Sequence, residues 1–210
     1  QYKNGEMSLL AFLKDDSLVA DLYNILFGDF KVYGFTIADF DDLYKTQETE
    51  ITTLQPVLDL PSVILLYELE RKFHFTIGQD FIVPRILVHH LEISLQNEMH
   101  GAPHGIYQMV VNRLVPTNNT ESWLISRLKD LLAWINENAQ IEDTSERLNQ
   151  NQDVFKESQY LTLFYDCFSL VKPGRVLVCA DKTMVQTFAK HVPVADINYL
   201  LNKNEQYTAI

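Results

Sequence analysis

The sequence is poor in residues that mark several common classes of protein. Its 210 residues include only 2 cysteines, 7 glycines and 7 prolines, and the cysteines form no CxxC pair. Cys167 and Cys179 stand in apolar surroundings, which predicts free buried thiols in a reducing compartment rather than a disulfide framework. The scarcity of glycine and proline argues against a many-turned β sandwich and favours helices joined to short buried strands.

Other absences restrict the function. We find no apolar run long enough to cross a membrane and no secretory leader, so we expect a cytoplasmic protein without membrane contact. The motifs GxSxG, GxxxxGK[ST], GxGxxG and HExxH are all missing, which removes the usual signals for several hydrolases and nucleotide-binding enzymes. Because the chain begins with Gln1, we expect it to be part of a longer protein or to have lost a leader or tag.

Positive charge is also scarce. The chain has 17 Lys and Arg against 28 Asp and Glu, a formal net charge of −11. Since non-specific affinity for nucleic acid comes mostly from Lys and Arg that neutralise phosphates, this balance opposes a broad phosphate-binding face. It is compatible with a metal-dependent nuclease, because bound cations change the local field at a carboxylate cluster. It also suits a protein partner or a homo-oligomer.

Hydrophobic periodicity predicts alternating strands and helices from residue 54 onward. Helices are expected over 62–75, 84–97, 123–136, 158–171 and 183–191, and strands over 54–58, 81–83, 175–179 and 192–195. Segment 106–115 fits a helix or a strand, and the polar segment 137–153 fits a loop or an exposed helix. Such alternation implies βαβ units. We therefore predict an α/β fold, a three-layer α/β/α sandwich with a mostly parallel sheet of four or five strands.

The first 50 residues have a different character. Leucines in residues 8–27 recur near the spacing of an amphipathic helix, and residues 38–53 are acidic and polar. We therefore predict an N-terminal helical extension or linker over residues 1–50 and a main domain over residues 51–210.

Two of the predicted strands are followed by an aspartate and then a helix. Asp59 follows the apolar run 54–58, and Asp181 follows the run 175–179. Because the carboxyl ends of parallel strands lie at one edge of a sheet, where ligands bind, these carboxylates can converge. Each aspartate can equally be explained as the N-cap of the helix behind it.

In this order and spacing, residues 54–202 resemble a PIN domain, a metal-dependent nuclease fold. The resemblance rests on the strand before Asp59, the helix led by Pro84, the strand before Asp181, and the closing Val-Pro-Val segment at 192–194. It implies a divalent-metal-dependent endoribonuclease, or a domain of one, that hydrolyses phosphodiester bonds in single-stranded RNA.

The resemblance also implies a site of three or four acids that holds Mg²⁺ or Mn²⁺. Carboxylate oxygens are the ligands such cations prefer, and the metal would activate water and stabilise the leaving oxygen. Carried over residue by residue, the implied catalytic and metal-binding residues are Asp59, Asp181, Glu92 and Glu157, with His90 as a further metal ligand.

Departures from the family pattern imply an alternative function. Ala180 and Lys182 stand where the family has Thr and a second Asp, and His90 stands where its helix carries an acid. With fewer carboxylates, the chain would be a catalytically degenerate PIN-like module that serves for protein interaction within a multidomain protein.

Overall fold

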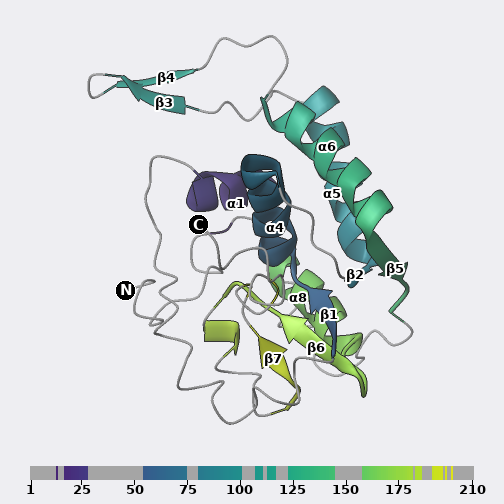
Figure 1. Cartoon of the computed structure of the whole chain (residues 1–210). Coiled ribbons are helices and arrows are strands. Elements are labelled where there is room, and N and C mark those ends of the chain that lie inside the picture. The colour runs from purple at the N-terminus through teal and green to yellow at the C-terminus, as the bar shows by residue number, and fades with distance from the viewer. Residues whose placement is uncertain are drawn as a thin grey trace.

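The computed structural model shows an α/β fold built on one parallel sheet (Figure 1). The residues it describes are 13, 17–27, 54–74, 80–100, 107–110, 113–116, 123–144, 158–181, 183–185, 191–195, 197 and 200, with only the backbone described at 107–110 and 113–116. The helices are α1 (Leu18–Phe27), α4 (Leu60–Phe73), α5 (Arg85–His100), α6 (Trp123–Asn138) and α8 (Gln159–Ser169). The strands are β1 (Gln55–Leu58), β2 (Phe81–Pro84), β3 (Tyr107–Val110), β4 (Arg113–Pro116), β5 (Ala139–Glu142), β6 (Arg175–Val178) and β7 (Val194–Ala195).

The sheet has five parallel strands in the order β5-β2-β1-β6-β7. Counted along the chain, this order is 3-2-1-4-5. The chain therefore builds outward from β1 to β2 and β5, then returns to the other side of β1 to add β6 and β7. The predicted α/β fold with a parallel sheet of four or five strands is confirmed.

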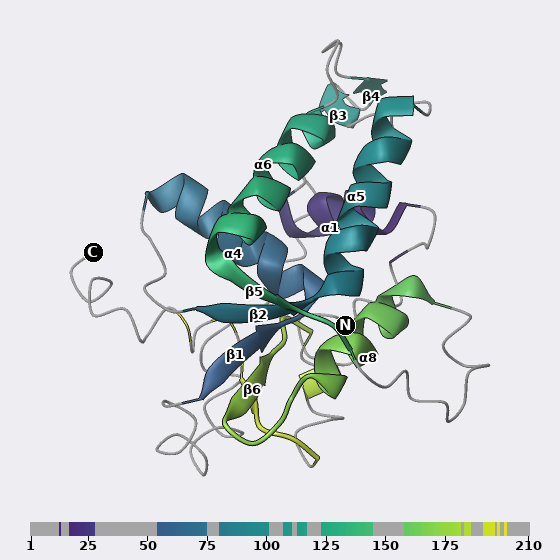
Figure 2. The ribbon, with the colours of Figure 1, turned by 90° about the vertical axis from the view of Figure 1, so that its right-hand side faces the viewer.

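Helices flank this sheet. In Figure 2, α4, α5 and α6 stand above the strands, and α8 lies lower, beside β1 and β6. Crossovers between parallel strands are almost always right-handed, so reversing the direction of strand addition moves the connecting helix to the other face. No helix within the described residues is long and apolar enough to cross a membrane.

Helix α1 packs against the same core as the main fold. One face of it is buried, through Leu18, Val19, Leu22, Tyr23 and Leu26. The spacing of these residues is that of an amphipathic helix. They belong to one core cluster with residues of β1 and β6, and α1 contacts α4. A helix in the N-terminal segment was predicted, and the division near residue 50 stays a prediction.

Two segments have structures that the sequence left open or that we did not predict. The polar segment 137–153 was predicted to be a loop or an exposed helix, yet residues 139–142 form β5, which pairs with β2. All four residues of β5 are at least partly exposed, because an edge strand buries less surface than a central one. Segment 106–115 contains most of an antiparallel hairpin formed by β3 and β4.

One ion pair joins the edge strand β5 to β6. The Arg175 guanidinium makes a bidentate pair with Glu142, with Nη2–Oε1 at 2.6 Å and Nη1–Oε2 at 2.9 Å. Its Nη1 also donates to the carbonyl of Leu170, the C-cap of α8, at 3.0 Å. The two side chains are 17% and 20% exposed. This single cation therefore links β6, β5 and the end of α8.

We expect Glu142→Gln to lower the free energy of unfolding by about 1–3 kcal/mol, because charge-assisted hydrogen bonds in partly buried positions contribute about that much. Urea unfolding measures the change. The matched control is Asp143→Asn, which breaks a pair with Arg85 whose side chains are 75% and 61% exposed; its expected cost is below about 1 kcal/mol. If both variants lose the same free energy of unfolding, the Arg175–Glu142 pair does not stabilise the fold more than an exposed ion pair does.

Candidate functional site

The two predicted aspartates lie where strand addition changes direction, between β1 and β6. These strands pair in register, with Leu58 opposite Val178. Asp59 directly follows β1, and its N–H donates to the carbonyl of Val178 at 3.2 Å. Asp181 follows β6 after two further residues. Both therefore stand at the carboxyl ends of neighbouring strands, at the topological switch point where doubly wound sheets bind ligands.

Asp59 is the N-cap of α4. Its backbone is extended, at φ −76° and ψ 166°, and its Oδ1 accepts a hydrogen bond from the Ser62 N–H at 2.9 Å. Pro61 fits the first turn, where no intrahelical donor is needed. The residue is fully buried, and its Oδ2 has no hydrogen-bond partner within the described part of the chain.

Asp181 holds the start of the next helical segment in the same way. Its Oδ1 accepts from the N–H groups of Thr183 at 3.0 Å and Met184 at 3.4 Å. Its carbonyl accepts from the Val185 N–H at 2.9 Å, and the residue is fully buried. The explanation of both aspartates as helix caps is thus confirmed. A cap that uses Oδ1 is compatible with a second role for the same carboxylate.

Two buried thiols lie beside these carboxylates. Cys167 Sγ donates to the carbonyl of Leu58 at 3.3 Å, and Cys179 Sγ accepts from the Asp181 N–H at 3.4 Å. Both cysteines are free and buried, as predicted. Burial, followed by the negative charge of Asp59, raises the pKa of each thiol well above its ordinary value. Both thiols therefore stay protonated near neutral pH and are poor nucleophiles.

The electrostatics of Asp59 differ from those of an exposed carboxylate. The pKa of Asp59 is raised to about 6, mainly by burial and, to a much smaller extent, by the nearby charge of Asp181. The Cys179 thiol and the hydroxyl and N–H of Ser62 act in the opposite direction. The charge of Asp181 is the smallest of these influences, so burial dominates the electrostatics of Asp59.

The structure does not gather the remaining predicted ligands into this site. Glu92 lies on α5 with its side chain 54% exposed, and its Oε2 is 3.5 Å from His89 Nδ1. His90 is half-buried on the same helix, and at 3.6 residues per turn its side chain lies about 200° around the axis from Glu92. Glu157 and Lys182 lie outside the described residues. Among the residues that are described, no three His, Cys, Asp or Glu side chains form a group that could hold a metal ion.

Ser62 is the neighbour of Asp59 that we did not single out from the sequence. It is fully buried and contributes both its N–H and a hydroxyl to the surroundings of the carboxylate. The signal was present, because a Ser three residues after an N-cap Asp lies in the first helical turn, where polar side chains face the cap.

No protein-family model, no curated protein and no solved structure matches this chain. The functional argument therefore rests on the topology of the sheet and on the chemistry at its switch point.

The raised pKa of Asp59 predicts a pH-dependent stability. A carboxyl whose folded pKa of about 6 exceeds its ordinary value of 3.8 binds more protons in the folded state between these values, so stability falls as pH rises through this window. The loss corresponds to about 3 kcal/mol above pH 6. Asn cannot ionise and is also a good N-cap, so Asp59→Asn should not show this loss. We therefore expect the difference in the free energy of unfolding, variant minus wild type, to be about 3 kcal/mol larger at pH 7 than at pH 4.

Urea unfolding of both proteins in metal-free buffer at pH 4, 5, 6 and 7 measures this difference. A gap between variant and wild type that is the same at pH 4 and at pH 7 would contradict the prediction.

Proposed function

We propose that this chain carries a PIN-like domain that hydrolyses phosphodiester bonds in single-stranded RNA with the help of Mg²⁺ or Mn²⁺, alone or as part of a larger cytoplasmic protein. One observation carries the proposal. Two fully buried carboxylates, Asp59 and Asp181, follow adjacent parallel strands at the switch point of the sheet and act on each other electrostatically. Open α/β sheets bind their ligands at this place.

The proposal needs a hydrated divalent cation at Asp59 and Asp181, which are both fully buried in this structure and have no third metal ligand beside them among the described residues. Mg²⁺ usually keeps several waters and takes one or two protein carboxylates together with substrate phosphates, so two aspartates are a sufficient protein contribution. Asp59 Oδ2 is a buried acceptor without a partner in the described part of the chain, and an unsatisfied buried acceptor is destabilising until it is bound. Asp59 and Asp181 would hold the cation. Glu157, Glu92 and His90 remain the further ligands that the PIN resemblance implies.

A divalent cation bound here would lower the pKa of its water and stabilise charge on phosphate oxygens. The chain would hold the two carboxylates in place and would supply the electric field of nearby helix N-termini. Backbone N–H groups of Ser62 and Thr183 fix the two carboxylates through Oδ1. The positive ends of α4 and of the helical segment 183–185 point at the same edge of the sheet, which favours an anionic phosphate there. Burial lowers the local dielectric constant and so strengthens each of these interactions.

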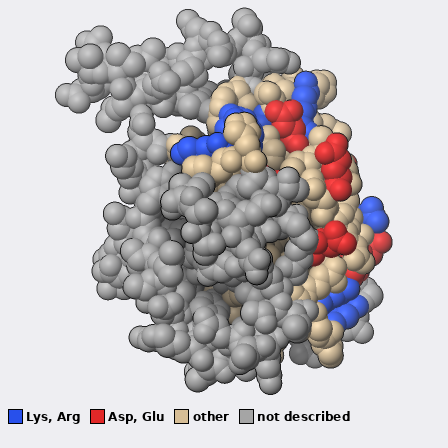
Figure 3. Space-filling model, viewed as in Figure 1, with Lys and Arg blue, Asp and Glu red and all other residues tan. Residues whose placement is uncertain are grey.

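The distribution of charge bears on how RNA would bind to this protein. On the described part of the face seen in Figure 3, basic and acidic side chains lie among one another. Because the whole chain has 17 Lys and Arg against 28 Asp and Glu, we expect RNA to bind mainly through the cation and the helix N-termini rather than through a broad basic face.

A second function is favoured by a specific observation: both aspartates are fully buried and already serve as helix caps, while Glu92 stays exposed. A catalytically degenerate PIN-like module that binds a protein partner or a second copy of the chain would need the aspartates only as caps.

Cleavage of a fluorescently labelled single-stranded RNA separates the two functions. We expect the wild type to cleave with Mn²⁺ and not with EDTA, and Asp59→Asn and Asp181→Asn each to lower the rate at least about 100-fold, because each variant replaces an anionic ligand with a neutral one. Asn remains a good N-cap, so both variants should fold.

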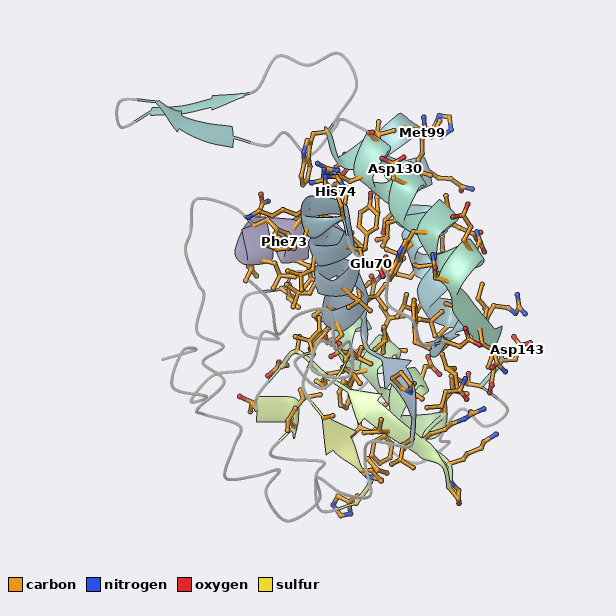
Figure 4. All side chains as sticks on the ribbon, viewed as in Figure 1. Glu70, Phe73, His74, Met99, Asp130 and Asp143 are labelled. Atoms are coloured by element: carbon orange, nitrogen blue, oxygen red, sulfur yellow. The ribbon has the colours of Figure 1, made fainter. Side chains whose placement is uncertain are left out.

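The matched control is Asp143→Asn, which changes an exposed carboxylate beyond the end of β5, labelled in Figure 4; it should keep the wild-type rate. Absence of cleavage by the wild type at every Mn²⁺ concentration, or equal cleavage by all the variants, would exclude the nuclease and leave the interaction module.

A further inference from the structure

A cluster of charged side chains joins α4 to α6, away from the switch point. Its centre is Glu68, whose side chain is 8% exposed. Arg71, in the last turn of α4, donates to Glu68 Oε2 from Nε at 3.0 Å and from Nη2 at 2.9 Å. Arg127 of α6 approaches the other carboxylate oxygen, with Nε–Oε1 at 3.6 Å. Two guanidinium groups therefore meet one carboxylate, and these three groups carry one net positive charge.

The cluster also reaches α1 through Tyr23. Burial raises the pKa of Tyr23 well above its ordinary value, and the charge of Glu68 acts in the same direction. The charges of Arg127 and Arg71 lower the pKa of the same phenol. All three charged groups thus lie within electrostatic reach of one buried side chain.

Two aromatic rings beside this cluster are open to solvent. Trp123 is 38% exposed and Phe27 is 37% exposed. The Tyr23 ring contacts both of them, with its centroid 5.3 Å from that of Trp123 and 5.9 Å from that of Phe27. The Arg127 guanidinium lies over the Trp123 ring, 5.2 Å from its centroid. Exposed rings and cations therefore adjoin where α1, α4 and α6 meet.

Stabilisation of the fold accounts for only part of this arrangement. A cation three residues after Glu68, in the last turn of α4, supports the helix and complements its dipole. Arg71 fills both roles, yet its side chain is 44% exposed and remains open to a ligand. Arg127 adds a second positive charge to a carboxylate that Arg71 already satisfies. Of the exposed charges nearby on the same two helices, Lys72 and Asp130 offset each other.

We propose that Arg71, Arg127 and Trp123 form a second RNA contact, in which the guanidinium groups bind a phosphate of single-stranded RNA and a neighbouring base stacks on the indole. The choice of RNA as the ligand rests on the proposed function. Guanidinium donors match the geometry of phosphate, and bases of any sequence can stack on an aromatic ring. Because Glu68 already holds the guanidinium groups, binding orders them at a smaller entropic cost.

This contact is local and separate from the switch point. Glu68 lies nine residues after Asp59 on α4, which is about 14 Å along the axis at 1.5 Å per residue. The contact needs no cation at Asp59, so its existence can be tested without metal. It is also compatible with the net charge of −11, which opposes a broad basic face rather than a single phosphate contact.

The test measures binding of a fluorescein-labelled oligouridylate of about ten nucleotides by fluorescence anisotropy, in EDTA and over a series of NaCl concentrations. The variants are Arg71→Gln and Trp123→Leu. The matched control is Arg85→Gln, which removes the same charge from an arginine whose side chain is 61% exposed and paired with Asp143. Urea unfolding of each protein verifies that it is folded.

We expect Arg71→Gln to weaken binding about 10-fold at low salt, because it removes charge-assisted hydrogen bonds. It should also reduce the slope of log K against log salt concentration by about 0.7, the value for one phosphate contact on a single strand. Trp123→Leu should weaken binding about 5-fold or more with an unchanged slope, because stacking releases no counterions. Arg85→Gln should bind like the wild type.

Equal losses in Arg71→Gln and Arg85→Gln, or no binding by the wild type in EDTA at low salt, would overturn this contact. Displacement of the RNA by an oligoglutamate peptide as effectively as by unlabelled RNA would overturn it too, and would indicate an acidic protein segment instead. Cleavage with Mn²⁺ is scored separately. A wild type that binds RNA through these residues without cleaving it excludes the nuclease and keeps the contact, whereas one that cleaves without needing them overturns the contact alone.

Discussion

The parallel pairing of β1 with β6 is the contact on which the rest of the structure depends. It joins segments that are far apart in the chain, from Gln55 opposite Arg175 to Leu58 opposite Val178. It makes β1 the central strand and turns strand addition back across it, so that helices flank the sheet on both sides. It also places Asp59 and Asp181 at the carboxyl ends of two neighbouring strands, although they are far apart in the sequence.

Burial of these two aspartates makes their charged forms unfavourable, and the same burial would favour a bound cation at the switch point. A charged carboxylate in a fully buried position is unfavourable unless it is hydrogen-bonded or paired. The helix N-termini satisfy part of this requirement through Oδ1 of each residue. What is left, the raised pKa of Asp59 and its unpartnered Oδ2, is the feature that a cation would relieve. The same burial explains why a purely structural role for the two residues is a coherent alternative.

Much of the fold could be predicted because its elements have strong local signals. Helix α6 has a regular apolar stripe, and β1, β2 and β6 are short strands in which nearly every residue is apolar and buried. Strand β5 lacked such a signal, because its Ala-Gln-Ile-Glu sequence is partly polar and it gains its place only by pairing with β2 at the edge of the sheet. In the site, Asp59 and Asp181 followed from strand ends, whereas Ser62 was missed although its place in the first turn behind the N-cap Asp59 was a local signal.

The sequence by itself determined the class of fold, the free state of the two cysteines and the position of the two aspartates at strand ends. These properties depend on periodicity, on composition and on residues next to each other in the chain. Only the tertiary structure decided which strands are neighbours, that Glu92 stays exposed, and that Asp59 and Ser62 are both fully buried. Burial and pairing depend on contacts between distant segments, and no local pattern specifies them.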